Sequence, residues 1–504
     1  MNKPFYITTP LYYVNARPHI GHAYTTILCD TFARFHRFLG EEVFFMTGTD
    51  EHGTKIDQAA KAQGKEAKLY VDEMVPVFKK LWDIIGIRYD HFIRTTDPSH
   101  QEIVQTILKR LESKRDIYKG NYKGWYCTPC ESFWTQLQLA GGKCPDCRRD
   151  VQELCEENYF FKLSNYQLWL VDYIGKHPGF ILPKTRQNEI LTFLEQPLED
   201  LCITRPRSRL SWGISYPESP EYVVYVWFDA LINYVSGIEY SLATQKFSSF
   251  WPADVHMVGK DILRQHAVYW PIMLKALDIE MPQTVLANGW WTIEGSKVSK
   301  SRGNTVDPFE IVNRYGVDAL RYYLLHEVKL GFDGSYSEDL LVERFNSDLA
   351  NDLGNLVLRA TSMLDRYFKG KIPSTAGQDH SPLKKKVSEM LEIVRNQMRD
   401  FQPEGAIDAI WSVVREANRF VEQKKPWVLA RERQQDELGN VLIELLETVR
   451  LLGVILFPFL PMSSRKILQL FGMKDDPTVK EFKWGTLKPN TQIDKGEPLF
   501  PKVE

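Results

Sequence analysis

The alternation of apolar and polar segments in the first fifty residues predicts a strand, a helix and a second strand. Residues 5–9 (FYITT) form an apolar run typical of a buried strand, and a polar turn follows it. Apolar positions then recur with helical spacing as far as Leu39, and Gly40 stands where a C-terminal cap is expected. Residues 43–46 (VFFM) form a second run that ends in the polar segment GTDEHG. This pattern is typical of a parallel βαβ unit, in which ligands bind at the carboxyl ends of the strands.

Farther along the chain the pattern changes twice. Between about residues 115 and 220 it has no clean helical period and is rich in aromatic residues, glycines and cysteines, which indicates an insertion. The α/β pattern then resumes in three apolar runs that end in polar residues, YVVYVWFDA, VHMVGKD and TVLANGWW. From about Phe345 the pattern is helical and amphipathic, with residues 369–382 as an exposed loop between helices.

Length and charge narrow the class of protein. A chain of 504 residues is too long for one hydrophobic core, so two to four domains are expected. The formal net charge of −2 argues against a uniformly basic, indiscriminate nucleic-acid binder. A local patch of lysine and arginine is still able to bind RNA.

No segment predicts a secretory signal or a membrane span. The N-terminus enters the first predicted strand without a charged and apolar leader, which favours the cytoplasm. The longest apolar run, Leu451 to Met462, is interrupted by Pro458 and is too short to cross a hydrocarbon core of about 30 Å. We expect a core helix followed by a turn there.

The segment His19-Ile20-Gly21-His22 lies where the first turn leads into the predicted helix. Backbone N–H groups and the helix dipole favour an anion at that position. Gly21 allows a ligand to approach the backbone, and two imidazoles within one turn can both donate hydrogen bonds to phosphate oxygens. By itself so short a segment more often has a packing role.

A second candidate phosphate-binding segment is Lys297-Val298-Ser299-Lys300-Ser301, followed by Arg302-Gly303-Asn304. Its lysines suit a flap over a polyphosphate, and a solvated basic turn is the alternative. Together and in this order, the two segments resemble the HIGH and KMSKS signatures of class I aminoacyl-tRNA synthetases, with Val298 in place of the usual methionine. The resemblance implies attack of an amino-acid carboxylate on the α-phosphate of ATP, which gives an aminoacyl adenylate and pyrophosphate.

The same resemblance implies roles for the residues of both segments. His19, Gly21 and His22 hold the phosphates of ATP. Lys297 and Lys300 stabilise the departing pyrophosphate together with Mg²⁺. Because the nucleophile is already an anion, catalysis depends on positioning and electrostatic stabilisation and needs no general base in this step.

Segments spread over the whole chain resemble the methionyl-tRNA synthetases. They are TTPLYYVNARPHIGHA, FMTGTDEHG, YVWFDALINY, GKDILRQHAVYWP, NLVLR and KKPW. This resemblance implies L-methionine and ATP as substrates and tRNA(Met) as the acceptor. The related leucine, isoleucine and valine enzymes usually carry a longer editing insertion, since one methylene discriminates by only about 1–3 kcal/mol.

The methionine side chain is apolar and polarisable, so an aromatic pocket with one or two donors is expected. The residues that match the family's methionine pocket are Leu11, Tyr13, Asp50, Trp227, Ala230, Leu231, Tyr234, Ile262 and His266. The family pattern implies that the Tyr234 hydroxyl and the Leu11 N–H meet the sulfur, and that Asp50 accepts the substrate ammonium. Gly259 and Asp261 match positions that hold the ATP ribose. Taken alone, the aromatic spacing predicts helix packing.

Four of the seven cysteines form two Cys-x-x-Cys pairs, Cys127 with Cys130 and Cys144 with Cys147. Paired turns of this kind supply four thiolates, which is the closed form of a structural zinc site. We therefore expect one structural Zn²⁺ per chain, and free or disulfide-bonded cysteines are the alternative. Cys155 is near enough to compete as a ligand but lacks a partner at this spacing.

The helical tail resembles the anticodon-binding bundle of the family. Asn355 and Arg359 are four residues apart and share one helix face, and Trp427 offers an aromatic plane beside Lys424 and Lys425. These residues match the family's anticodon-reading positions. Core packing is the alternative for Trp427, and a scaffold or an oligomerisation bundle is the alternative for the whole tail. No appended OB-fold is found, so a monomer is expected.

The expected fold class is α/β, a Rossmann-like parallel-sheet catalytic domain with a zinc-bearing insertion, followed by an all-α bundle that binds the anticodon. The expected domains are catalytic halves at 1–114 and 221–290, a connective insertion at 115–220, a KMSKS-loop and stem-contact region at 291–344, and an anticodon-binding domain at 345–504. Two other functions stay open. A catalytically silent RNA-binding relative need not keep both signatures and Asp50, and a small-molecule nucleotidyltransferase need not have the cysteine pairs or the tail.

Overall fold

The computed structural model describes residues 3–502, except 129–131, 135, 137–138, 146, 241–244, 294–295, 298–305, 375–380 and 474. The chain divides into two compact units. The first unit comprises residues 1–18, 44–83 and 88–288, and the second comprises residues 19–43, 84–87 and 289–504.

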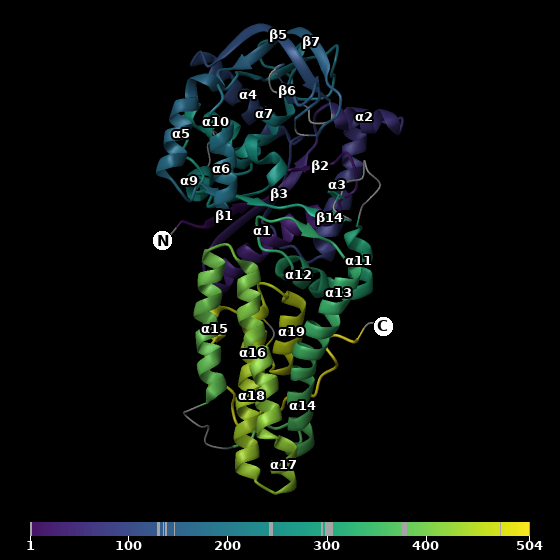
Figure 1. Ribbon diagram of the computed structural model, residues 1–504, viewed down its shortest axis with the longest axis vertical. Helices are drawn as coiled ribbons and strands as arrows, with labels where there is room; N and C mark the ends of the chain where they lie inside the picture. The colour runs from purple at the N-terminus through teal and green to yellow at the C-terminus, as the bar shows by residue number, and fades with distance from the viewer. Residues whose placement is uncertain are drawn as a thin grey trace. The chain divides into compact units, whose positions relative to one another are not determined.

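A seven-stranded sheet forms the centre of the first unit (Figure 1). Its order is β2-β3-β1-β12-β13-β8, and β4 also pairs with β3. The strands are β1 (Phe5–Thr8), β2 (Tyr12–Tyr13), β3 (Val43–Asp50), β4 (His91–Arg94), β8 (Ile181–Leu182), β12 (Val255–Gly259) and β13 (Thr284–Asn288). The pairs β1–β12, β12–β13, β13–β8, β2–β3 and β3–β4 are all parallel. Carboxyl ends of neighbouring strands therefore lie at one edge, as expected of a sheet that binds ligands there.

The predicted strands at the start of the chain are confirmed, but only two of the three later apolar runs enter the sheet. VHMVG and TVLAN form β12 and β13. YVVYVWFDA divides instead into β11 (Tyr222–Val224), which pairs antiparallel with β10 (Thr204–Pro206), and helix α7 (Val226–Leu231). Both the strand part and the helix part of this run are almost wholly buried. Its apolar composition therefore does not distinguish a strand from a helix.

The first unit has a hydrophobic core that includes Ile103, Phe228 and Trp270, and it contains further helices. They are α2 (Thr54–Ala62), α3 (Ala67–Ile84), α4 (Pro98–Ser113), α5 (Gln167–Lys176), α6 (Lys184–Phe193), α8 (Asn233–Ser236), α9 (Lys246–Phe250) and α10 (Trp270–Ala276). Two short 3-10 helices, η2 (Leu163–Tyr166) and η3 (Lys260–Ile262), and the π-helix η4 (Gln265–Tyr269) also belong to this unit.

The segment predicted as an insertion contains a separate antiparallel sheet. Its strands are β5 (Ile117–Cys127), β6 (Ser132–Trp134), β7 (Gln152–Phe161) and β9 (Leu201–Cys202), in the order β6-β5-β7-β9. The long antiparallel pair of β5 and β7 is the largest part of this sheet (Figure 1). Strand β8 lies within the residues assigned to the insertion and pairs with β13 of the main sheet.

Helix α1 (Ile20–Leu39) belongs to the second unit and ends as predicted at Gly40, whose φ of 87° suits glycine. Asp30 of α1 is fully buried, and its carboxylate lies 2.7 Å from Arg34 Nε and 2.8 Å from Arg321 Nη1. Arg321 lies on α12 (Val317–His326) and also donates to the carbonyl of Phe459. Around α12 lie α11 (Pro308–Tyr315), α13 (Glu338–Arg344) and the short strands β14 (Trp291–Ile293), β15 (Ser296–Lys297) and β16 (Gly334–Ser335).

The rest of the second unit is helical, as predicted from Phe345 onward. Its elements are the π-helix η6 (Phe345–Gly354), α14 (Asn355–Phe368), α15 (Pro382–Arg399), α16 (Pro403–Lys424), α17 (Pro426–Arg431), α18 (Gln435–Leu456), α19 (Pro461–Leu470) and the 3-10 helix η7 (Val479–Glu481). The long helices α14, α15, α16 and α18 pack side by side (Figure 1). The apolar run from Leu451 ends α18 and continues into a turn before α19, as expected. No helix among the described residues is long and apolar enough to cross a membrane. Of the predicted loop at 369–382, residues 375–380 lie outside the described part of the chain.

Candidate functional site

Three of the predicted methionine-pocket residues form an aromatic cluster in the first unit, Trp227 on α7, Tyr234 on α8 and His266 on η4. The Trp227 and His266 rings meet edge to face with centroids 6.4 Å apart, and the Tyr234 and His266 centroids are 5.6 Å apart. Tyr234 and His266 are buried, whereas Trp227 is half-buried. The structure therefore brings together side chains that come from three separate elements.

The hydrogen bonds of His266 fix its tautomer. Its Nδ1 lies 2.8 Å from the carbonyl oxygen of Ile262, and because a carbonyl only accepts, Nδ1 carries the proton. Nε2 is then the acceptor of the Tyr234 hydroxyl, 2.7 Å away. Burial lowers the pKa of His266 to about 4, so the ring is neutral at neutral pH. The Tyr234 proton points at His266, and a hydrogen bond from Tyr234 to a sulfur atom requires that proton to turn away.

A second group of predicted residues lies at the carboxyl end of β3. Asp50 ends β3, is 6% exposed and is the register partner of Tyr13 on β2. The Tyr13 hydroxyl donates to the carbonyl of His52 at 2.8 Å. Leu11, Tyr13 and Ile262 all pack against the hydrophobic core of the first unit. Ala230 and Leu231 follow Trp227 on α7.

A buried polar network, which the sequence pattern did not reveal, connects the two groups. Asp229 of α7 lies 2.6 Å from His52 Nδ1 through Oδ2 and 2.7 Å from His100 Nε2 through Oδ1. We call these three residues, His52, Asp229 and His100, the carboxylate bridge. His52 and Asp229 stand in the segments GTDEHG and YVWFDA, but no spacing in the sequence indicates that they meet.

The predicted ribose-binding residues lie at the carboxyl end of β12. Gly259 ends this strand, and Asp261 lies two residues later in η3. A Cβ atom on Gly259 would lie 2.7 Å from Asp261 Oδ1, so the absence of a side chain leaves room for that carboxylate. Asp261 is exposed. The end of a parallel strand is the expected place for a nucleotide contact.

The HIGH segment begins helix α1, as predicted. His19 is the N-cap residue, and its Nδ1 accepts a hydrogen bond from the Gly21 N–H at 3.1 Å. The Nδ1 of His22 accepts from the His19 N–H at 3.0 Å. Since both Nδ1 atoms are acceptors, the ring proton of each neutral imidazole lies on Nε2. The capping hydrogen bonds thus leave both histidines in the tautomer that can donate through Nε2.

The predicted lysine segment is described only in part. Lys297 ends β15, and its backbone is the register partner of Thr292 on β14. Lys300 and the rest of residues 298–305 lie outside the described residues.

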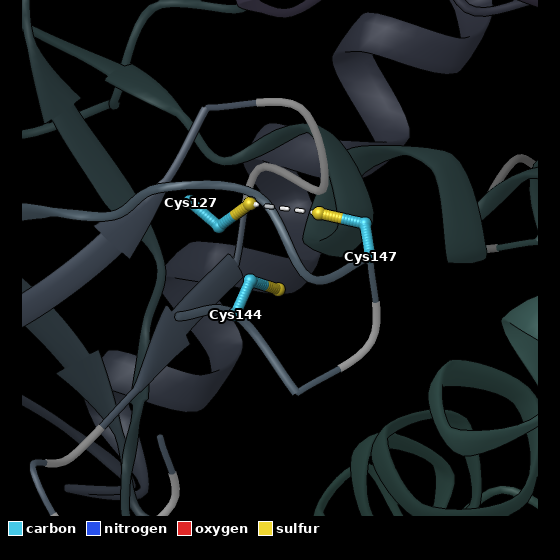
Figure 2. A group of neighbouring side chains, drawn as sticks. All are labelled: Cys127, Cys144 and Cys147. Atoms are coloured by element: carbon cyan, nitrogen blue, oxygen red, sulfur yellow. Dashed lines mark hydrogen bonds between the residues drawn. The ribbon is translucent and has the colours of Figure 1, made fainter. Parts of the chain in front are cut away.

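Three of the four predicted zinc ligands converge in the insertion (Figure 2). The sulfur atoms of Cys127, Cys144 and Cys147 all lie within 4.8 Å of one another, and those of Cys127 and Cys147 are 3.5 Å apart. A tetrahedral zinc site with Zn–S bonds of about 2.3 Å places its sulfurs roughly 3.8 Å apart, so the three thiols fit such a site. Cys130 lies outside the described residues. Cys155 is exposed on β7 and does not belong to this group of three.

The predicted anticodon residues lie on the surface of the helical part of the second unit. Asn355 is exposed and Arg359 half-buried, one turn apart on α14. Trp427 of α17 is 41% exposed, which argues against the alternative of core packing. Arg359 Nη2 lies 2.7 Å from Oε1 of Glu422 on α16, a partner that the sequence pattern did not predict.

Comparison with known proteins agrees with these observations. The family model of class I (M) tRNA synthetases matches residues 5–156 and 152–361, and that of the anticodon-binding domain of methionyl-tRNA ligase matches residues 372–504. The chain is similar to the methionine–tRNA ligase of Caldanaerobacter subterraneus, with 48% identity over 100% of this chain and 80% of the relative. It is also similar to that of Thermotoga maritima, with 45% identity over 99% and 80%.

Solved structures show the same similarity in three dimensions. The Mycobacterium tuberculosis methionyl-tRNA synthetase in complex with methionyl-adenylate aligns with a TM-score of 0.94 and 39% identity. That alignment covers 99% of this chain and 100% of the solved one.

Proposed function

This chain belongs to the methionyl-tRNA synthetase family, and from that premise we propose where it binds its substrates. It is a class I methionine–tRNA ligase, which activates L-methionine with ATP to methionyl-adenylate and pyrophosphate and then transfers methionine to tRNA(Met). The observation that carries the residue assignment is the aromatic cluster of Trp227, Tyr234 and His266, because it offers polarisable rings and neutral hydrogen-bonding groups to a thioether.

The methionine site of this proposal contains Leu11, Tyr13, Asp50, Trp227, Ala230, Leu231, Tyr234, Ile262 and His266. Asp50 binds the substrate ammonium through a charge-assisted hydrogen bond. Tyr234 and the Leu11 N–H meet the sulfur, provided that the Tyr234 proton leaves His266. A neutral His266 suits this site, since a buried cation would repel the substrate ammonium.

For ATP we propose His19, Gly21 and His22 on the phosphates and Gly259 and Asp261 on the ribose. Two Nε2–H groups at the N-terminus of α1 donate to phosphate oxygens, and the helix dipole adds to their effect. ATP enters as its Mg²⁺ complex.

Lys297 and Lys300 neutralise the departing pyrophosphate in this proposal. Stabilisation of charge that develops on phosphoryl oxygens is the main catalytic effect available to such a site. The attacking carboxylate needs no base.

Zn²⁺ is the metal that we propose for the cysteine group, with Cys127, Cys130, Cys144 and Cys147 as its ligands. When bound, the metal supplies folding free energy to this part of the insertion and no chemistry to the reaction. The convergence of three thiols supports the assignment.

For tRNA(Met) we propose that Asn355, Arg359 and Trp427 bind the anticodon. Trp427 supplies a stacking surface, and Arg359 exchanges Glu422 for a base edge. We further propose a monomeric cytoplasmic enzyme with domain boundaries at 114, 220, 290 and 344. The molar mass measured by light scattering tests the proposed monomer.

Amino-acid-dependent exchange of pyrophosphate into ATP tests the proposed activity. Purified enzyme is assayed with all twenty amino acids, with and without tRNA. We expect the exchange rate with methionine to be well above the rate with any other amino acid. We also expect exchange to proceed without tRNA. Exchange that is absent with methionine, or equally strong with leucine, would contradict the proposal.

A further inference from the structure

We propose that Asp229 is a positioning residue for methionine, which acts by holding the two halves of the proposed methionine site at a fixed separation. This inference rests on the proposed function, because it concerns the same substrate. It adds His52 and His100, through their contacts with Asp229, to the residues that determine methionine affinity.

The carboxylate bridge joins three elements of the first unit. His52 follows β3, Asp229 lies in α7 and His100 lies in α4. Each oxygen of the Asp229 carboxylate has its own imidazole partner, at 2.6 and 2.7 Å. His100 Nδ1 lies 2.7 Å from the Ser236 hydroxyl of α8, so the network reaches a fourth element. Asp229 is fully buried, and hydrogen bonds in such an environment hold their partners firmly.

The charge of Asp229 strengthens the bridge. Burial by itself raises the pKa of this carboxyl, but His52 and His100 outweigh the effect and bring the pKa below its usual value. The carboxylate is therefore ionised at neutral pH and accepts two charge-assisted hydrogen bonds.

Each end of the bridge adjoins residues of the proposed methionine site. On one side, the His52 carbonyl accepts the hydrogen bond of Tyr13, and Asp50 stands two residues earlier in the chain. On the other side, Trp227, Ala230 and Leu231 share the six-residue helix α7 with Asp229. The bridge thus links the part that binds the ammonium group to the part that binds the side chain, and a shift of α7 changes their separation.

The test is Asp229→Asn, measured by methionine-dependent pyrophosphate exchange. The amide keeps the size of the carboxylate but presents an NH₂ group to one of the two imidazoles, so the network cannot be satisfied as before. We expect the KM for methionine to rise by about tenfold, the KM for ATP to change by less than about twofold, and kcat to change less than the methionine KM.

Asp116→Asn is the matched control. Asp116 is also a buried carboxylate of the first unit, and it accepts a hydrogen bond from Tyr166 at 2.9 Å. We expect both KM values to stay within about twofold of the wild type in this variant. A rise in methionine KM that is equal in both variants would overturn the proposal, because it would reflect a general effect of a lost buried carboxylate.

The two histidines provide a second test that needs no change at Asp229. Glutamine can place an N–H where His100 Nε2 lies, and asparagine can do so for His52 Nδ1, whereas leucine cannot. We expect His100→Leu and His52→Leu to raise the methionine KM, and His100→Gln and His52→Asn to restore most of the affinity. These pairs decide the question if Asp229→Asn does not fold. Methionine KM values that are the same for leucine and amide variants, with differences only in thermal stability, would show a purely structural role.

Failure of this inference is distinguishable from failure of the proposed function. A wild-type enzyme without methionine-dependent exchange contradicts the function itself. Normal wild-type exchange together with an unchanged methionine KM in Asp229→Asn contradicts only the positioning role.

Discussion

At the scale of single residues, position 21 needs a glycine because the His19 imidazole lies against it. A Cβ atom at Gly21 would lie 2.9 Å from Cε1 and 3.1 Å from Nδ1 of His19, and its N–H donates to that ring. Alanine at this position must therefore displace the His19 imidazole. We expect Gly21→Ala to lower the rate of adenylate formation by about tenfold or more, while methionine binding changes little.

Single-turnover adenylation and equilibrium dialysis of methionine measure these two effects. Gly175→Ala is the control, because a Cβ atom at Gly175 of α5 meets no atom of the described residues within 4 Å. Equal rates in the two alanine variants would mean that the His19 ring has no part in the reaction.

The acid response of the fold should depend on His266. Burial brings its folded pKa to about 4, below the usual value of about 6.5, so the unfolded chain takes up the proton first as the pH falls. The stability that a neutral His266 contributes is complete above about pH 6.5 and is lost between about pH 6.5 and 4, up to roughly 3 kcal/mol. Urea unfolding at several pH values should show that the wild type loses more stability over this range than His266→Gln. Parallel losses would contradict a buried neutral histidine.

Much of the candidate site was predictable at this scale, but its connecting residues were not. The aromatic cluster and the two capping histidines stand in segments that resemble a known family. The carboxylate bridge joins residues 177 and 129 positions apart, and neither helical nor strand periodicity indicates such a pair. The positions of Lys300 and Cys130 are not among those that the structure describes.

At the scale of elements, the segment with Cys144 and Cys147 places their two thiols close to that of Cys127. The Arg148 N–H donates to the Cys144 carbonyl at 2.9 Å, and Arg148 has a positive φ of 62°, so these two backbone positions lie next to each other. The cysteines pack with Trp134 in a small separate core. A metal bound here holds together a part of the chain that has few apolar contacts of its own.

Removal of one ligand should therefore release the metal. We expect the wild type to contain one zinc per chain by elemental analysis, and Cys144→Ser to lose most of it. We expect transfer of methionine to tRNA to fall further than pyrophosphate exchange, because the proposed zinc shapes the insertion and takes no part in adenylate formation. Cys155→Ser is the matched control and should keep its zinc, since Cys155 is exposed and lies outside the group of three. Full zinc content in Cys144→Ser would contradict the assigned ligand set.

The elements that could be predicted are those long enough to show a clear apolar repeat. Helix α1, its glycine cap and the helical tail have a clear apolar repeat, so their sequence indicates them strongly. Strands β8 and β11 have two and three residues, too few to show any alternation, and β11 lies in an apolar run that continues as helix α7. Pairing between such short strands depends on tertiary packing that no local pattern contains.

At the scale of the whole molecule, recognition of tRNA should be separable from methionine activation. Trp427 is exposed on α17, and the stacking of one base on an aromatic side chain contributes about 1–3 kcal/mol. We expect Trp427→Ala to raise the KM for tRNA by about tenfold or more, with tRNA-independent pyrophosphate exchange unchanged.

Met462→Ala provides the control for loss of an exposed apolar side chain in the same unit. Met462 is 46% exposed on α19, and its replacement should affect neither assay. Loss of both activities in Trp427→Ala would instead indicate that Trp427 supports the fold.

The buried ion pairs of Asp30 with Arg34 and with Arg321 have a consequence for recombination between relatives. Because α1 belongs to the same compact unit as residues 289–504, a crossover between residues 288 and 289 separates Arg321 from the carboxylate of Asp30. A charge left buried without its partner costs about 3–5 kcal/mol. Chimeric synthetases should therefore tolerate an exchange of residues 289–504 only when the donor also supplies helix α1, or when both parents carry the same three charged residues.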